Sequence, residues 1–217
     1  MKFRSTVPNA PSVMLMVACL LPVCGSLCLL SGCKTTRMTP EELSAEERDR
    51  RLRESYRLFS AGQAAQKSGN LQAAREYYSQ AVELNADLAA AWNNLGIVLM
   101  ESEKPDYLNA AAALRKSAEL SPSDPRPYEN LGLLYRRAGW YPESVRYYGM
   151  SLERDKNYLP SLRGYALGAI ETSAIDETLL EHIKQALLIE TEPAWRLEFE
   201  RFKLRVEGEL RAMKEAK

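Results

Sequence analysis

Apolar and small side chains recur at helical spacings along the middle of this chain. In residues 92–99, Leu95 and Gly96 lie three and four positions after Trp92, and Leu99 lies four and three positions after them. These spacings place the side chains on one face of a helix. Residues 128–135 repeat this order of large and small side chains. Gly62, Gly96 and Gly132 hold the same place in successive units, and the numbering advances by 34 and then by 36. No segment alternates as a β-strand does, so the pattern predicts consecutive helical units of nearly equal length.

A second helix is predicted in each unit. It carries the small residues Ala74, Ala110 and Ser144, whose numbering advances by 36 and then by 34. The middle unit therefore has two extra residues before Ala110, and we expect them in the turn around Lys104–Pro105. The other two units have a glycine at this turn, where a left-handed residue ends a helix well. These glycines are Gly69 and Gly139.

The repeated positions resemble the tetratricopeptide repeat, a helix–turn–helix unit. The resemblance rests on Trp92-Asn93-Asn94-Leu95-Gly96 and on Tyr128-Glu129-Asn130-Leu131-Gly132. It implies an all-α solenoid in which the small residue lets the two helices of a unit approach closely. The implied units are 55–88, 89–124 and 125–158, followed by a degenerate fourth unit at 159–190.

Two further helices are expected at the ends of the solenoid. Residues 39–54 begin with Thr39-Pro40-Glu41-Glu42, which is typical of a helix start, and continue as an ion-paired helix more typical of a solvated face than of a lipid-binding patch. Residues 191–217 carry an apolar stripe that either caps the last unit or pairs with a partner helix. The stripe is Trp195, Phe199, Phe202, Val206, Leu210 and Met213.

The segment that ends at Cys33 looks like an export signal. Lys2 and Arg4 precede an uncharged apolar stretch, and Leu30-Ser31-Gly32-Cys33 resembles the bacterial lipobox, which implies cleavage before an acylated Cys33. Residues 1–32 would then be the signal peptide and 33–38 a short tether. The alternative is an uncleaved membrane anchor, which Pro22 would weaken. Lys34 follows the cysteine, and this implies the periplasmic face of the outer membrane if the host has two membranes.

The amino-acid composition limits which catalytic and metal-binding sites the chain can form. Cys33 is the last of four cysteines, so the chain after it has no thiol nucleophile or thiolate metal site. After residue 32 there are 27 basic and 29 acidic residues, which argues against a nucleic-acid partner. The single histidine, His182, is better explained by packing than by catalysis. We expect no catalytic residue, metal, cofactor or small-molecule substrate.

The resemblance implies that the first helices of stacked units line a concave groove for an extended or helical segment of a partner protein. In the implied register the groove candidates are Phe59, Gln63, Asn93, Asn94, Ile97, Met100, Arg126, Asn130, Leu133 and Arg136, with Gln66, Glu129, Arg163 and Leu167 at further groove positions. Asparagine amides can donate to and accept from a peptide backbone, although they can also only cap or solubilise the repeat. A clamp for a C-terminal carboxylate is disfavoured, because Phe59 and Gln63 replace the basic residue and the asparagine that it needs.

These features predict a non-enzymatic scaffold, lipid-anchored in a bacterial envelope, that binds a partner polypeptide. By architecture it resembles pilotin-like lipoproteins, which help pilus or secretin channels to assemble. An adaptor for cell-wall hydrolases or synthases is the alternative, and an enzyme with a shallow site on the solenoid is a third hypothesis from another class.

Overall fold

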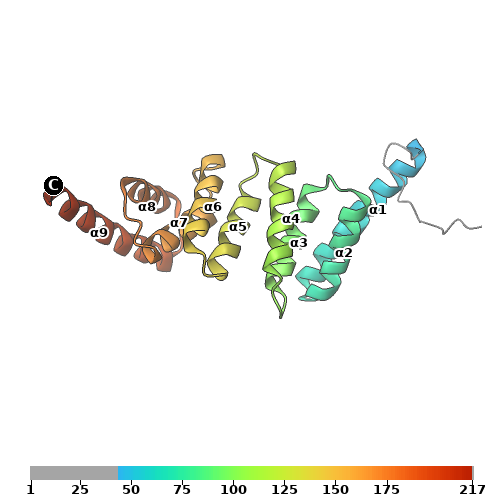
Figure 1. Cartoon of the computed structure of the whole chain (residues 1–217), viewed down its shortest axis with the longest axis horizontal. Helices are drawn as coiled ribbons and strands as arrows, with labels where there is room; N and C mark the ends of the chain where they lie inside the picture. The colour runs from blue at the N-terminus through green and yellow to red at the C-terminus, as the bar shows by residue number, and fades with distance from the viewer. Residues whose placement is uncertain (1–43, 217) are drawn as a thin grey trace, which may run out of the picture. The chain divides into compact units, whose positions relative to one another are not determined.

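The computed structural model describes residues 44–216, and within this range every regular element is an α-helix (Figure 1). The predicted all-α fold is therefore confirmed. The signal peptide, Cys33 and the expected helix start at Thr39-Pro40 lie outside these residues. The helices are α1 (Ala45–Lys67), α2 (Leu71–Leu84), α3 (Ala89–Glu101), α4 (Tyr107–Leu120), α5 (Arg126–Arg137), α6 (Tyr141–Arg154), α7 (Leu159–Glu171), α8 (Glu177–Ile189) and α9 (Pro193–Glu215).

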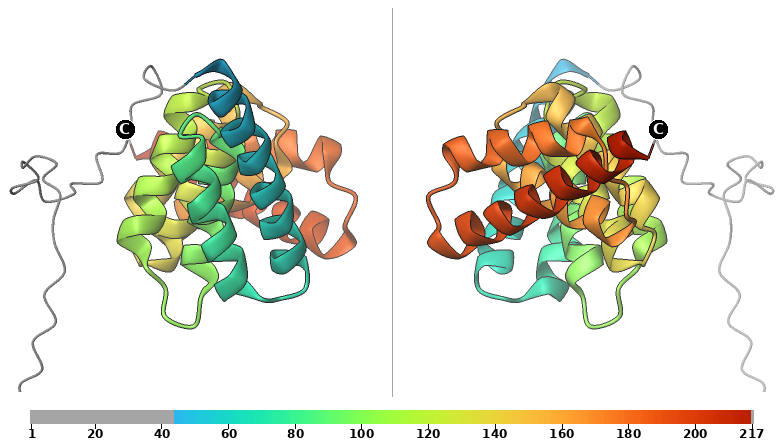
Figure 2. Two further views of the ribbon diagram at one scale, coloured as in Figure 1. Left: turned by 90° about the vertical axis from the view of Figure 1, so that its right-hand side faces the viewer. Right: turned by 90° about the vertical axis from the view of Figure 1, so that its left-hand side faces the viewer.

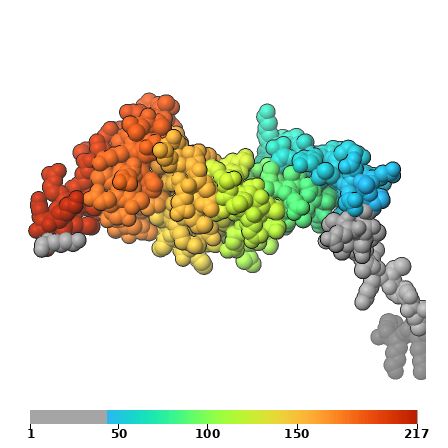
Figure 3. Space-filling model, turned by 90° about the horizontal axis from the view of Figure 1, so that it is seen from above, coloured from blue at the N-terminus to red at the C-terminus, as the bar shows by residue number. Residues whose placement is uncertain are grey.

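The helices pack as consecutive pairs. The strongest packing joins α1 to α2, α3 to α4 and α5 to α6, and each pair also packs on the next one along the chain. Figure 3 shows the colours following one another in chain order along the described part of the chain. In addition, α3 contacts α5 and α5 contacts α7. The first helices of the second, third and fourth units, α3, α5 and α7, therefore form a continuous side of the helix array.

The turns inside the units explain the unequal repeat lengths. Gly69 and Gly139 have φ angles of 79° and 80°, a region that glycine adopts without steric cost. Each lies in a three-residue turn, between α1 and α2 or between α5 and α6. The turn between α3 and α4 spans residues 102–106 and is two residues longer, as the sequence predicts.

The core consists of two clusters of buried side chains. The first runs from Leu58 to Tyr147 and is shared by the first three units, while the second runs from Leu152 to Val206. Buried serine hydroxyls tie neighbouring helices together. Ser117 Oγ donates to the Ala89 carbonyl at 2.9 Å, and satisfying a buried hydroxyl in this way avoids a desolvation penalty.

Helix α9 covers the second cluster. It packs on α8, and Figure 2 shows it lying across the end of the helix array. Phe199, Phe202 and Val206 are buried, and Trp195 and Leu210 pack at their edges. Met213 differs from the prediction: it is 47% exposed, because it lies near the end of a helix that extends past its neighbours. The stripe from Trp195 to Leu210 thus acts as a cap.

None of the helices between residues 44 and 216 combines the length and the apolar composition that crossing a bilayer requires. This finding concerns the folded repeats only.

Candidate peptide-binding groove

The inner faces of α3 and α5 carry a continuous chain of polar side chains. Asn130 Nδ2 donates to Asn93 Oδ1 at 2.9 Å, and Asn93 Nδ2 donates to Asn94 Oδ1 at 3.3 Å. Asn94 Nδ2 then donates to the Tyr78 hydroxyl at 3.2 Å, which donates to Gln66 Oε1 at 2.9 Å. These four hydrogen bonds connect three consecutive units across the groove.

The chain leaves hydrogen-bonding capacity free. A primary amide has two N–H donors and an oxygen with two lone pairs. Asn93 and Asn94 use one donor each and accept one hydrogen bond each, so every amide keeps at least one donor and one lone pair for another group. Asn130 itself is 8% exposed, so its amide mainly supports the network. The asparagines can therefore both stabilise the repeat through their mutual hydrogen bonds and offer free donors and acceptors to a peptide.

Half-buried apolar side chains flank the polar chain. Ile97 and Leu133 are partly accessible, and Phe59 packs against Tyr78 with ring centroids 5.9 Å apart. Gln63 is exposed on α1. Met100 contradicts the expectation that it lines the groove: it is 1% exposed within the first core cluster, where its flexible thioether fills space between helices.

The inner face of α5 also carries charges. Arg126 is held by Asp124, with Nη2 and Oδ2 2.7 Å apart. Glu129 forms no hydrogen bond or ion pair with any residue between 44 and 216, and burial raises the pKa of its carboxyl group to about 7. Arg136 Nε is a buried donor, and no other buried side-chain nitrogen or oxygen in the described part of the chain lacks a hydrogen-bond partner. The carboxyl group of Glu129 and the Nε–H of Arg136 therefore remain available for a ligand.

Tyr148 extends from α6 toward these charges. A Cβ atom built on Gly132 of α5 would lie 2.8 Å from the Tyr148 ring, and one built on Gly164 of α7 would lie 2.2 Å from its Cζ atom. The ring thus fills the space between the two helices. Burial, and next the negative charge of Glu129, raise the pKa of Tyr148 to about 12, while Arg136 acts in the opposite direction. The tyrosine hydroxyl, Glu129 and Arg136 form one polar group at the groove floor.

Arg163 contradicts its expected role as a groove contact. Its guanidinium group donates to both carboxylate oxygens of Glu190 at 2.8 Å and to Glu192 at 3.1 Å. It also lies over the Trp195 ring, 4.8 Å from the centroid. Because Glu190 is 2% exposed, this pair is a buried link between α7 and the start of α9. Nothing in the spacing of the repeats predicts a partner 27 residues away.

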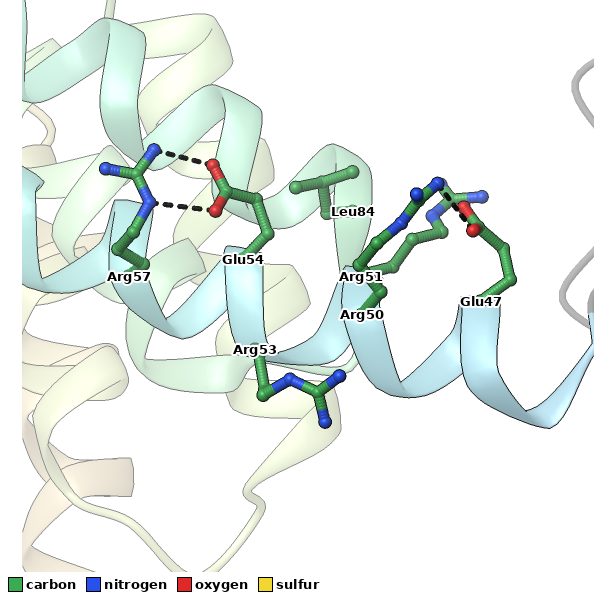
Figure 4. Close-up of a pocket in the computed structure, with 7 residues that line it drawn as sticks. All are labelled: Glu47, Arg50, Arg51, Arg53, Glu54, Arg57 and Leu84. Atoms are coloured by element: carbon green, nitrogen blue, oxygen red, sulfur yellow. Dashed lines mark hydrogen bonds and ion pairs between the residues drawn. The ribbon is translucent and has the colours of Figure 1, made fainter.

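Three ion pairs on the charged surface of α1 join residues of the same helix. Figure 4 shows Arg57 pointing toward Glu54, and Arg50 and Arg51 beside Glu47, whereas Arg53 points away from them. The pairs Arg57–Glu54 and Arg50–Glu47 are three residues apart, the usual distance for a helix surface. Their exposure indicates a solvated face.

His182 lies at the edge of the fourth unit. Its ring meets the Tyr165 ring edge-on, with centroids 4.7 Å apart, and burial lowers the pKa of the imidazole. Among residues 44–216, no three His, Asp or Glu side chains are arranged to hold a metal ion. The inner face offers amide hydrogen-bonding groups, charged side chains and half-buried apolar side chains.

Comparison with known families agrees with this geometry. The model of the tetratricopeptide repeat matches residues 62–102, which run from the middle of α1 to the end of α3. Residues 62–102 are therefore similar to a tetratricopeptide repeat. Both features that define such a unit, a small residue at the helix crossing and a turn to a second helix, are present in the matched segment.

Curated relatives match only part of the chain. A BBSome complex member BBS4 homolog of Drosophila melanogaster is 32% identical over 78 residues, which are 36% of this chain and 16% of that protein. The photosystem I assembly protein Ycf3 of Prochlorococcus marinus strain NATL1A is 29% identical over 94 residues, 42% of this chain and 53% of Ycf3. The matched repeats thus span about half of Ycf3 and far less of the BBS4 homolog.

Solved structures share the fold at low identity. MamA from Desulfovibrio magneticus RS-1 has a TM-score of 0.55 at 19% identity, covering 62% of this chain and 75% of that one. The first repeat domain of Spaghetti (RPAP3), bound to the HSP90 peptide SRMEEVD, has a TM-score of 0.52 at 15% identity, covering 56% and 97%. A Thermobaculum terrenum O-GlcNAc transferase also matches, at a TM-score of 0.55, 21% identity and coverages of 67% and 26%. Tetratricopeptide folds therefore occur both in binding domains and within enzymes.

Proposed function

We propose that this chain is a membrane-anchored scaffold that holds a segment of a partner polypeptide in the groove formed by α3 and α5. The amide chain between Asn130 and Gln66 carries this proposal, because its free donors and lone pairs match those of a peptide backbone. Half-buried Ile97 and Leu133 add apolar area beside it. The peptide bound to the RPAP3 domain supports this use of the fold, at the level of analogy.

The proposed anchor is Cys33, acylated after cleavage of the signal peptide. Support comes from Leu30-Ser31-Gly32-Cys33 and from the positive and apolar segments before it. Three acyl chains, as the lipobox resemblance implies, would hold the protein on the membrane almost permanently, since two already anchor stably. The folded repeats would then recruit their partner at the surface of the envelope membrane.

The proposed role is help in assembling an envelope complex such as a pilus or a secretin channel, and an adaptor for cell-wall hydrolases or synthases is the alternative. Both use the same groove and the same anchor. They differ in the partner, so cross-linking in intact membranes followed by recovery of the chain separates them. Secretin or pilus subunits would support the first role and cell-wall enzymes the second.

The groove is tested by changing its apolar side chains. Ile97→Glu and Leu133→Glu together place charges on the inner face, and we expect recovery of the cross-linked partner to fall at least tenfold. The matched control is Leu108→Glu on α4, where the side chain is already 78% exposed. Circular dichroism must show unchanged helicity in all variants. Undiminished recovery from the groove variant would place the interaction on another surface.

The anchor is tested by metabolic labelling with a fatty-acid probe. We expect the wild-type chain to carry the label and Cys33→Ala to lack it. If the label persisted in Cys33→Ala, the lipobox assignment would be wrong.

A further inference from the structure

Three side chains on α5 form a stripe with an acid at one end and a base at the other. Glu129, Leu133 and Arg136 are separated by four and then three positions, so they lie on one face of the helix. This stretch of α-helix separates the Cα atoms of Glu129 and Arg136 by about 10 Å along the axis. No ion pair joins the two side chains among the described residues, and burial alone accounts for the raised pKa of Glu129.

The acid at one end of the stripe, Glu129, has no ion-pair partner in the described part of the chain. The nearest arginine toward the start of the helix, Arg126, is already bound by Asp124. Glu129 thus differs from Glu190, whose buried carboxylate is matched by Arg163. A shielded carboxylate without a counter-ion is costly, and a cation brought beside it by a ligand would remove this cost.

The base at the other end has an unmet hydrogen bond. The buried Nε–H of Arg136 has no acceptor within residues 44–216, and an unsatisfied buried donor is rare in folded proteins. Arginine binds carboxylates through two parallel N–H groups, one of which can be Nε–H. A small rotation of the guanidinium toward an incoming carboxylate would satisfy this donor, so an anion is the ligand that this end favours.

We propose that the α5 stripe selects a partner segment that presents a basic and an acidic side chain about 10 Å apart, the span set by the helix rise, with an apolar or small residue between them. The inference rests on the proposed function and names the chemistry of its ligand. The geometry suits an extended segment of polyproline II type, which has three residues per turn and a rise of about 3.1 Å, so that residues i and i+3 face one side about 9 Å apart. The base would lie over Glu129 and the acid over Arg136, and the backbone of the two residues between them would pass over Leu133.

The test uses the whole chain and an array of ten-residue synthetic peptides. Each peptide carries one lysine and one glutamate in an alanine and proline background, at separations of one to six positions and in both orders. We expect the strongest binding at a separation of three, in one of the two orders. Neutral peptides of the same background should bind at least tenfold more weakly, and the difference should shrink at high salt.

Variants with altered charges distinguish specific binding by the α5 stripe from non-specific binding of charged peptides. Glu129→Gln and Arg136→Gln should each lower binding of the best peptide about tenfold while leaving binding of the neutral peptide unchanged. The double variant Glu129→Arg with Arg136→Glu should restore binding and prefer the opposite order of lysine and glutamate. Equal binding of charged and neutral peptides, or a double variant with no change in order, would overturn the inference.

Failure of this inference can be told apart from failure of the proposed function. If Ile97→Glu with Leu133→Glu abolishes recovery of the natural partner and the charge-swapped variant does not, the groove binds its partner but the stripe does not select it. If neither variant changes recovery, the groove itself is not the binding surface. Unchanged circular dichroism spectra are required for each comparison.

Discussion

Replacing Gly164 by alanine tests how tightly the third and fourth units interlock. The added Cβ atom would lie 2.2 Å from Cζ of Tyr148 and 2.4 and 2.6 Å from its two Cε atoms. The ring cannot retreat toward α5, because the backbone at Gly132 already lies against its other face. The substitution must therefore separate α7 from α5 or force Tyr148 into another rotamer.

The expected cost follows from these contacts. Relieving the overlap requires a shift of about 1 Å, and overpacking of this kind costs about 1–3 kcal/mol. Alanine gains up to about 1 kcal/mol over glycine within a helix, which offsets part of the loss. For a domain of this size, about 1 kcal/mol corresponds to about 2–4 °C, so we expect Gly164→Ala to lower the melting temperature by about 2–8 °C.

Thermal unfolding followed by circular dichroism measures the effect, with Gly208→Ala as the control. Gly208 lies inside α9, and its added Cβ would meet nothing within 4 Å. We therefore expect this control to raise the melting temperature by about 2 °C through helix propensity alone. Replacing glycine by alanine is thus expected to lower the melting temperature at Gly164 and to raise it at Gly208.

A second substitution identifies the cause. Tyr148→Leu removes the Cζ and Cε atoms that the new Cβ would meet, and leucine is the natural residue at the corresponding position, Leu114, of the second unit. In the Tyr148→Leu background, Gly164→Ala should cost less than about 0.5 kcal/mol, because the two sites are then no longer coupled. An equal loss in both backgrounds, or no loss with Tyr148 present, would refute the interlocking of ring and glycine.

Two further predictions concern charged groups. The pKa of Glu129 is about 7 in the folded chain and about 4.5 in the unfolded one, so the folded state retains a proton that the unfolded state releases, and stability falls as the pH rises from 4.5 to 7. Glu129→Gln should remove this loss of stability, so we expect it to stabilise the chain by roughly 1–3 kcal/mol at pH 8 and to have little effect at pH 4.5. Urea unfolding at both pH values measures the difference. Equal stability of the variant and the wild type at pH 8 would contradict the raised pKa of Glu129. Arg163→Ala should destabilise the chain by about 3 kcal/mol, because it leaves the buried carboxylate of Glu190 without a counter-ion, whereas Arg201→Ala on the exposed face of α9 should cost less than about 1 kcal/mol. Matching losses for the two arginines in urea unfolding would show that the Glu190 pair is not structural.

The fold could be predicted because its determinants are local and repeat. Glycine at the helix crossing, glycine or a longer turn at the end of the first helix, and spacings of three and four each act within one unit, so three copies reinforce one another. The extra residues at Lys104–Pro105 follow from simple counting, and the structure has them in the turn between α3 and α4.

Parts of the site could not be predicted, because they depend on neighbours that are distant in sequence. In each first helix, the face that lines the groove lies next to the face that packs in the core. Packing of α3 against α4 and α5 places Met100 on the core face. Arg163 is drawn away from the groove by Glu190, a residue outside its own helix pair. Arg126, three positions before Glu129, pairs with Asp124 instead, and no spacing rule predicts that choice.

The donor-to-acceptor order of the amide chain gives the binding surface a built-in direction. Each group from Asn130 through Asn93 and Asn94 to Tyr78 donates to the next, so the row begins with an open oxygen at the third unit and ends with an open NH₂ group on Gln66 at the first. If one amide alone were flipped, its NH₂ group would face the NH₂ group of its neighbour. The direction of the hydrogen bonds can therefore change only if every member of the row flips. A guest whose carbonyl group accepted a hydrogen bond from the open NH₂ group of Gln66 would thereby strengthen the polarisation of every link back to α5, and distant ends of the surface would respond to one docking event together.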